Sequence, residues 1–199
     1  MASEQILATR HGRLSTRLYR GSDGSIGMAL WVGDLAEQKP ILSRVHSSCF
    51  TSEGLFALDC DCVTQLDVAI YAIVQRTRGV IFYLLQEGRG AGLPNKARDR
   101  SIVQSSRGTI DTYGAYESLG LDPDPRTYGL VKPMCADLGI NQPLTLMTNN
   151  PSKIDALTAV GLDMSPPSRS SRRIRARGNL RPSRSSRSTK SSPTCAPRT

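Results

Sequence analysis

The sequence has no long apolar run and few aromatic side chains. Its 199 residues contain no stretch of eighteen apolar positions, so no membrane-spanning helix is expected. Phe, Trp and Tyr make up only 5% of the chain, and the first ten residues lack the apolar stretch of a secretory signal. We therefore expect a cytoplasmic protein without membrane contact, a setting in which disulfides are rare and clustered cysteines bind metal.

Acidic residues are absent from the C-terminal segment, residues 165–199, which contains ten Lys or Arg. Removing these ten from the 26 basic residues leaves sixteen against seventeen acidic ones, so residues 1–164 carry a net charge of −1. The overall charge of +9 belongs to the tail. A Ser-, Arg- and Pro-rich tail buries too little surface to offset its ordering entropy. We expect one folded domain, residues 1–164, and a disordered tail that binds nucleic acid weakly or not at all.

Short apolar runs alternate with amphipathic segments before the tail. Strands and turns are expected within residues 5–46, and strands at 79–85 and 144–147. Helical spacing predicts helices at 66–75, 97–106, 127–138 and 152–160, with one helical turn at 115–119. Residues 163–164 begin a strand that does not continue. This alternation predicts an α/β fold with a mixed sheet in a single domain.

Three cysteines lie close together, with Cys49, Cys60 and Cys62 forming a Cys-x10-Cys-x-Cys pattern. Zinc binds thiolates tetrahedrally, and a catalytic zinc site takes three protein ligands and leaves the fourth position to water, whose pKa it lowers. The pattern favours such a site, and three buried structural cysteines are the alternative. Cys135 and Cys195 are not clustered. We expect the first in the core and the second as a free thiol.

Polar residues adjoin the cysteines and the expected strand at 79–85. His46 has three interpretations: a metal ligand, a phosphate contact or, favoured from the sequence alone, a structural histidine. Residues 86–93, QEGRGAGL, follow the strand at the end where α/β proteins bind ligands. There Arg89 suits a phosphate and Glu87 suits a guanine edge. A glycine-rich surface turn is the alternative.

Two later segments carry similar chemistry. In DPDPR, residues 122–126, Asp124 could move protons and Arg126 could bind a phosphate, although a Pro-stiffened loop with a surface ion pair is the favoured interpretation. In TNNPSK, residues 148–153, a hydroxyl, two amides and an amine end the strand expected at 144–147. These groups suit phosphate or base contacts, and they equally suit an Asx turn that caps the next helix.

Together, four motifs resemble those of one family. RVHSSCFTSEGLFALDCDC, QEGRGAGLPNK, DPR and LMTNNPSK occur in the order seen in GTP cyclohydrolase II, the first enzyme of riboflavin synthesis, and the match covers about residues 10–164. The resemblance implies zinc-dependent opening of the GTP imidazole ring with release of formate and pyrophosphate. The product would be 2,5-diamino-6-ribosylamino-4(3H)-pyrimidinone 5′-phosphate. It also implies one Zn²⁺ per chain, Mg²⁺ with the triphosphate, and a homodimer.

The resemblance implies roles for individual residues. The zinc ligands would be Cys49, Cys60 and Cys62. The nucleotide contacts would be Arg44, Val45, His46, Ser47, Ser48, Gln65, Glu87, Gly88, Arg89, Thr112, Thr148 and Lys153. Asp124 corresponds to the family's proton acceptor, and Arg126 to the arginine proposed as nucleophile on the α-phosphate. A guanidinium stays protonated, so this last role comes from the family alone.

Two positions depart from the family's pattern. Ser48 stands where a glutamate is usual, and Arg100 stands where the family has a tyrosine assigned to the second hydrolytic step. These departures favour two alternatives: a homologue that stops at the formylamino-pyrimidine intermediate and serves a secondary pathway, and an impaired homologue that binds a nucleotide or a partner. A third alternative, a nucleic-acid-binding module that uses the tail, predicts steep salt dependence.

Overall fold

The computed structural model describes residues 4–122, 124–148 and 150–166. The expected tail therefore lies outside the described residues from position 167 onward. Among the described residues, no helix combines the length and apolarity that crossing a membrane requires.

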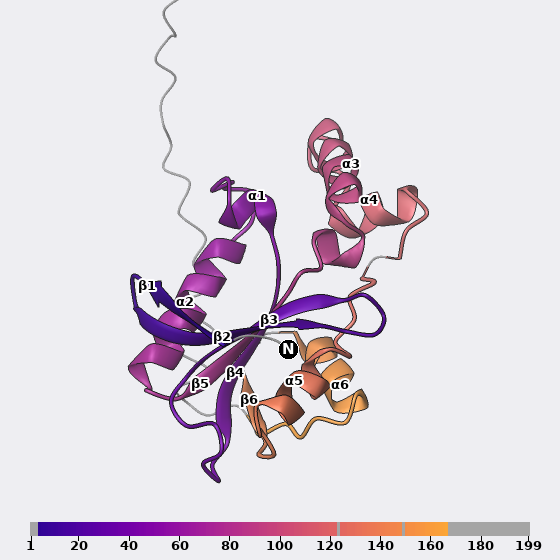
Figure 1. Cartoon of the computed structure of the whole chain (residues 1–199). Coiled ribbons are helices and arrows are strands. Elements are labelled where there is room, and N and C mark those ends of the chain that lie inside the picture. The colour runs from indigo at the N-terminus through magenta and orange to yellow at the C-terminus, as the bar shows by residue number, and fades with distance from the viewer. Residues whose placement is uncertain (1–3, 123, 149, 167–199) are drawn as a thin grey trace, which may run out of the picture.

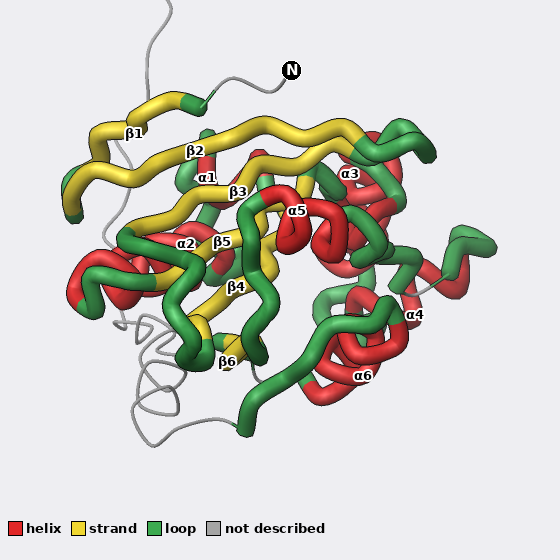
Figure 2. Tube along the Cα trace, turned by 60° about the horizontal axis from the view of Figure 1, so that its bottom comes forward, coloured by secondary structure: helices red, strands yellow, loops and turns green. Residues whose placement is uncertain are grey.

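The described strands form one mixed sheet in the order β1-β2-β3-β5-β4-β6 (Figures 1 and 2). They are β1 (Gln5–Thr9), β2 (Gly12–Arg20), β3 (Ile26–Val32), β4 (Ile41–Ser47), β5 (Gly79–Leu84) and β6 (Leu144–Leu146). β1, β2, β3 and β5 pair antiparallel, whereas β4 pairs parallel with both β5 and β6. The carboxyl ends of β4, β5 and β6 therefore meet at one end of the sheet.

Helices cover both faces of the sheet. They are α1 (Phe50–Glu53), α2 (Cys62–Gln75), α3 (Leu93–Ser105), α4 (Thr112–Ser118), α5 (Val131–Asp137) and α6 (Pro151–Ala159), with a 3-10 turn, η1, at Gly88–Gly90. The helix α2 packs on one face, α5 and α6 lie on the other, and α3 and α4 extend away from the sheet (Figure 1).

Alternate residues of the central strands divide the core into two layers. Ala29, Val80 and Phe82 belong to the cluster that includes residues of α5 and α6, whereas Leu30 and Ile81 belong to the cluster with α2. None of the five is more than 6% exposed. Burial of each large apolar side chain contributes about 1.5–3 kcal/mol, so this alternation fixes which face of the sheet each helix covers.

The predicted α/β fold is confirmed, and prolines explain two shifted helix boundaries. The predicted helix 127–138 is shorter, because α5 begins at Val131 and places Pro133 in its first turn, where a missing N–H costs no hydrogen bond. Similarly, α3 begins four residues before the predicted position 97, with Pro94 in its first turn. The strand expected at 163–164 makes a single bridge, between Leu144 and Met164.

Candidate functional site

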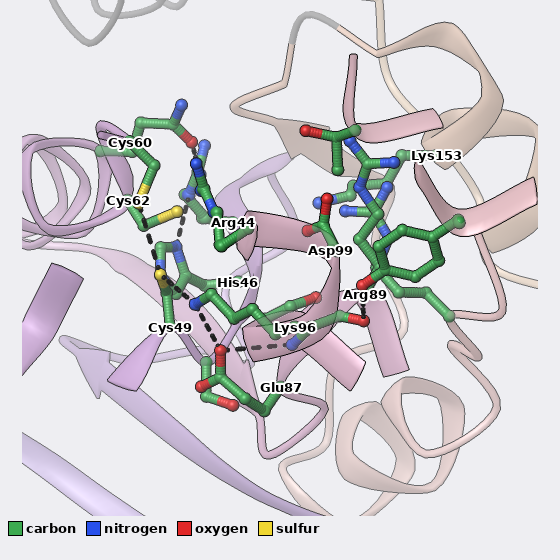
Figure 3. Close-up of a pocket in the computed structure, with 18 residues that line it drawn as sticks. Arg44, His46, Cys49, Cys60, Cys62, Glu87, Arg89, Lys96, Asp99 and Lys153 are labelled. Atoms are coloured by element: carbon green, nitrogen blue, oxygen red, sulfur yellow. Dashed lines mark hydrogen bonds and ion pairs between the residues drawn. The ribbon is translucent and has the colours of Figure 1, made fainter. Parts of the chain in front are cut away.

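A pocket of about 250 Å³ lies where the parallel strands end (Figure 3). The strand β4 leads into the first cysteine, β5 leads into η1, and β6 leads towards α6. Fourteen of the seventeen predicted site residues line this pocket, together with four that were not predicted as site residues. The lining comprises Arg44, His46, Ser47, Ser48, Cys49, Cys60, Cys62, Gln65, Glu87, Gly88, Arg89, Lys96, Asp99, Arg100, Thr112, Tyr116, Arg126 and Lys153.

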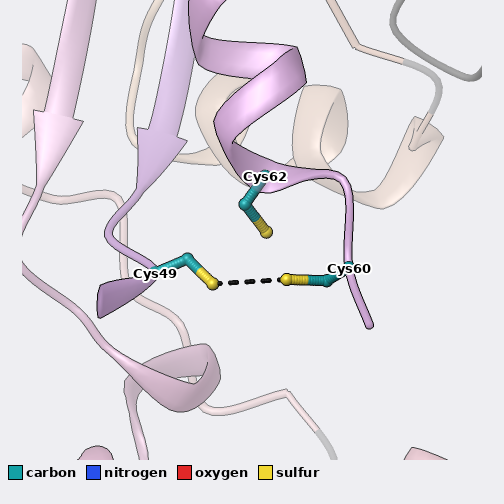
Figure 4. Close-up of side chains that lie close together, drawn as sticks. All are labelled: Cys49, Cys60 and Cys62. Carbon is teal, nitrogen blue, oxygen red and sulfur yellow. Dashed lines mark hydrogen bonds between the residues drawn. The ribbon is translucent and has the colours of Figure 1, made fainter. Parts of the chain in front are cut away.

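The three clustered cysteines converge although they come from different elements (Figure 4). Cys49 occupies the N-cap position of α1, Cys62 is the first residue of α2, and Cys60 lies two residues before it. The Sγ atoms of Cys49 and Cys60 are 3.5 Å apart, and all three sulfurs lie within 4.8 Å of one another. Tetrahedral zinc–sulfur bonds of about 2.3 Å separate sulfurs by roughly 3.8 Å, so this spacing suits zinc. Among the described residues, no fourth His, Cys, Asp or Glu joins the group, so a tetrahedral zinc ion held there would keep one position for water.

A buried lysine touches this cluster. The Lys96 side chain donates to the Cys49 sulfur at 3.0 Å and to Glu87 Oε1 at 2.5 Å, and the residue is only 7% exposed. Hydrogen bonding by Cys62 and then by Lys96 lowers the pKa of Cys49 to about 4, while the shared hydrogen bond raises the pKa of Cys62. Burial alone would lower the pKa of Lys96, but Glu87 and Cys49 raise it overall. The three side chains thus form a thiolate–ammonium–carboxylate series.

His46 is engaged on both sides of its ring. Its Nδ1 accepts from Arg44 Nε at 3.3 Å, so Nε2 carries the proton and donates to Glu53 Oε1 at 2.8 Å. Burial lowers the pKa of His46, and its ring stacks on Tyr83 with centroids 5.5 Å apart. Neither ring nitrogen is left for a metal. The geometry therefore favours a structural role for His46, which orients Arg44, and disfavours its role as a fourth zinc ligand.

Cationic side chains gather in the pocket. Arg44 donates to the Met147 carbonyl at 3.0 Å and to Gln65 Oε1 at 2.5 Å, and the Arg89 guanidinium lies 4.2 Å from the centroid of the Tyr113 ring. Burial, reinforced by Arg44 and Arg126, lowers the pKa of Lys153 to about 7. In Figure 3 the cysteines lie on one side of the pocket, and Arg89 and Lys153 lie on the other. Positive charge of this density suits a polyphosphate.

Three predicted site residues do not line the pocket. Val45 is 1% exposed and packs in the core, with its carbonyl accepting from Lys153 Nζ at 3.2 Å. The Thr148 hydroxyl accepts from the Asn150 amide at 3.1 Å, which holds the turn before α6. Asp124 pairs with Arg126, accepting from its Nε at 2.5 Å. This ion pair raises the pKa of Arg126 and, against the effect of burial, lowers that of Asp124.

Four lining residues were not predicted as site residues: Lys96, Asp99, Arg100 and Tyr116. Three of them lie on one face of α3 at positions i, i+3 and i+4, a spacing that a helical projection of residues 93–105 would have shown. Arg100 Nη1 lies 3.1 Å from Asp59 Oδ2. The Tyr116 hydroxyl donates to the Gly88 carbonyl at 2.6 Å and so holds η1 in place.

Comparisons with known proteins identify the family of the chain. The sequence model of the family described as GTP cyclohydrolase II matches residues 1–166. The GTP cyclohydrolase-2 of Teredinibacter turnerae is 47% identical over 137 residues, covering 69% of this chain and 67% of the relative. The GTP cyclohydrolase-2 of Shewanella amazonensis is 45% identical over 141 residues, covering 71% of this chain and 67% of the relative. The chain thus spans about two thirds of the length of these relatives. Because the family match covers most of the sequence, the chain belongs to the GTP cyclohydrolase II family.

Proposed function

We propose that this protein is a hydrolase that opens the imidazole ring of GTP, the first step of riboflavin synthesis. It would release formate and pyrophosphate and yield 2,5-diamino-6-ribosylamino-4(3H)-pyrimidinone 5′-phosphate. One observation carries the proposal: in a member of this family, three converging thiols share a pocket with cationic side chains. The thiols suit a metal that activates water, and the cations suit a triphosphate.

The proposed site divides into two halves. Cys49, Cys60 and Cys62 would hold one zinc ion, which supplies Lewis acidity for hydrolysis at C8 of the guanine ring. Arg44, Arg89 and Lys153, with Thr112, Gln65 and Ser47, would bind the nucleotide, and Mg²⁺ would accompany the triphosphate. The hydrogen bonds of Arg44 to Gln65, His46 and the Met147 carbonyl fix its guanidinium before substrate arrives.

Arg126 and Asp124 would act as a pair. The family's role for Arg126 is that of a nucleophile on the α-phosphate, and its role for Asp124 is that of a proton acceptor. Their ion pair favours the charged guanidinium, which suits electrostatic binding of the α-phosphate. A nucleophilic role would require Asp124 to remove a proton from Arg126 at the hydrogen bond that already joins them.

The wider assignments are also proposals. A folded domain of residues 1–164, a cytoplasmic location and a homodimer follow from the sequence and the family resemblance. The basic tail is proposed to contribute little to GTP binding, because the described residues that line the pocket all precede it.

The test is to incubate the zinc-loaded protein with GTP and Mg²⁺ and to identify products by mass spectrometry. The proposal expects formate, pyrophosphate and the diamino-pyrimidine nucleotide in equal amounts. Unchanged GTP, with zinc and Mg²⁺ present, would refute it.

A second candidate outcome is arrest at the formylamino-pyrimidine nucleotide. Arg100 stands at the position of the family's tyrosine, and its ion pair with Asp59 holds the guanidinium next to the segment that bears Cys60. A charged guanidinium cannot accept a proton, although it can stabilise an oxyanion. If the reaction stops there, GTP disappears faster than formate appears, and Arg100→Tyr raises formate release relative to GTP loss. Stoichiometric formate from the unmodified protein would exclude arrest.

A further inference from the structure

One carboxylate oxygen in the pocket lacks a hydrogen-bond partner among the described residues. Asp99 is 2% exposed, and its Oδ1 has no partner anywhere in the described part of the chain. Burial raises the pKa of Asp99, because its charged form is poorly solvated in the pocket. A buried, unpaired carboxylate oxygen is costly to keep, so this oxygen calls for a donor that the described residues do not supply.

The other carboxylate that lines the pocket, Glu87, already has hydrogen-bond donors on both of its oxygens. Glu87 Oε1 accepts from Lys96 at 2.5 Å and from the Gly88 amide at 3.2 Å, and Oε2 accepts from the Phe50 amide at 2.6 Å. The sequence suggested that Glu87 contacts the edge of the guanine ring, but both of its oxygens already accept hydrogen bonds within the protein. Asp99 is therefore the lining carboxylate with an oxygen that has no donor among the described residues.

Charge decides which part of a nucleotide Asp99 can face. A carboxylate repels phosphates, and the pocket has arginines and lysines for them. In the view of Figure 3, Asp99 lies between the cysteines and the Arg89–Lys153 side. A nucleotide that spans this pocket carries N–H and O–H donors only on its nucleoside half, since its phosphates are acceptors.

On the basis of the proposed function, we infer that Asp99 determines nucleotide specificity by accepting hydrogen bonds from two neighbouring donors on the nucleoside. Two pairs of donors have this chemistry: the N1–H and 2-amino group of guanine, and the 2′- and 3′-hydroxyls of ribose. Either pair can span the two oxygens of one carboxylate. A site built around such an acceptor discriminates strongly against nucleotides that lack the donor.

The test measures dissociation constants by competition against GTP that carries a fluorophore on its γ-phosphate. The competitors are GTP, ITP, XTP, 2′-deoxy-GTP and 3′-deoxy-GTP, and the proteins are the zinc-loaded unmodified chain, Asp99→Ala and Asp99→Asn. Glu117→Gln is the matched control, because it removes an exposed negative charge from the adjacent α4. Zinc content and circular dichroism verify that each variant is folded.

Asp99→Ala should weaken GTP binding by about 10-fold or more, the usual size for a hydrogen bond to a charged group, and weaken by a smaller factor the binding of an analogue that lacks one of the two donors. If guanine is the partner, the less affected analogue is ITP, which keeps N1–H but lacks the 2-amino group, and Asp99→Asn gains affinity for XTP because an amide matches the donor and acceptor of xanthine. If ribose is the partner, the less affected analogue is 2′-deoxy-GTP or 3′-deoxy-GTP, and Asp99→Asn retains part of the preference for GTP over that analogue. Equal ratios in all proteins, or a change only in the Mg²⁺ requirement, would overturn the inference. Failure of the unmodified chain to bind GTP would instead refute the proposed function.

Discussion

Lys96 offers the sharpest test of how the site is held together. Its side chain and that of Glu87 are only 9% and 16% exposed, and Lys96 also contacts Cys49. Replacing Lys96 by Met keeps the apolar stem but leaves the carboxylate buried without its counter-ion. Breaking a buried pair in this way costs about 3–5 kcal/mol. We expect about 3 kcal/mol, because Glu87 keeps hydrogen bonds to the Gly88 and Phe50 amides.

This loss of stability can be measured by urea unfolding of the metal-free protein, followed by the fluorescence of Trp31. That residue is the only tryptophan of the chain and is 9% exposed in the core. A change of about 3 kcal/mol corresponds to roughly 150-fold in the unfolding equilibrium constant. With a denaturant slope of about 2 kcal/mol/M, the midpoint should fall by about 1.5 M.

Two further variants separate the ion pair from a general effect of removing charge. Lys39→Met breaks an exposed pair with Glu37, in which the side chains are 74% and 43% exposed, so its midpoint should hardly move. Combining Lys96→Met with Glu87→Gln should cost less than Lys96→Met alone, because the neutral amide needs no counter-ion. A midpoint for Lys96→Met equal to that of the unmodified protein would show that the buried pair contributes nothing.

Three other predictions follow from the site. Cys60→Ser should lose zinc, measured by elemental analysis, whereas Cys135→Ser in the core should retain it; equal zinc in both would contradict the three-thiol site. Deleting residues 167–199 should leave the GTP dissociation constant within about twofold, because the lining residues that the structure describes all lie before the deletion. Near pH 8, GTP binding should take up about one proton: the pKa of Lys153 is about 7 in the free protein, and a nearby phosphate raises it. Calorimetry in buffers of different ionisation enthalpy measures this uptake, which should vanish in Lys153→Arg because arginine is charged throughout. Unchanged uptake in that variant would assign the proton to another group.

The sequence predicted the local features that short motifs encode. The three cysteines converge as their spacing suggested, and strands at 79–85 and 144–147 were placed within one residue because they are short, buried and apolar. The four-residue helix α1 was missed, since one turn shows no periodicity, although its Glu53 orients His46. Lys96 and Asp99 were also missed, because charged residues are usually solvated and only the packing of α3 against the pocket buries them.

Arg100 links the departure from the family pattern to the zinc ligands. Its ion pair with Asp59 connects α3 to the residue directly before Cys60, so a change at position 100 alters the support of a ligand as well as any proton transfer. Successive helical residues point about 100° apart, which explains why Arg100 reaches this turn while Asp99 keeps an unpaired oxygen. The formate assay on Arg100→Tyr therefore needs Asp59→Asn as its control. That variant removes the ion pair and leaves Arg100 in place. If both variants raise formate release equally, the ion pair and not the missing tyrosine limits the second step.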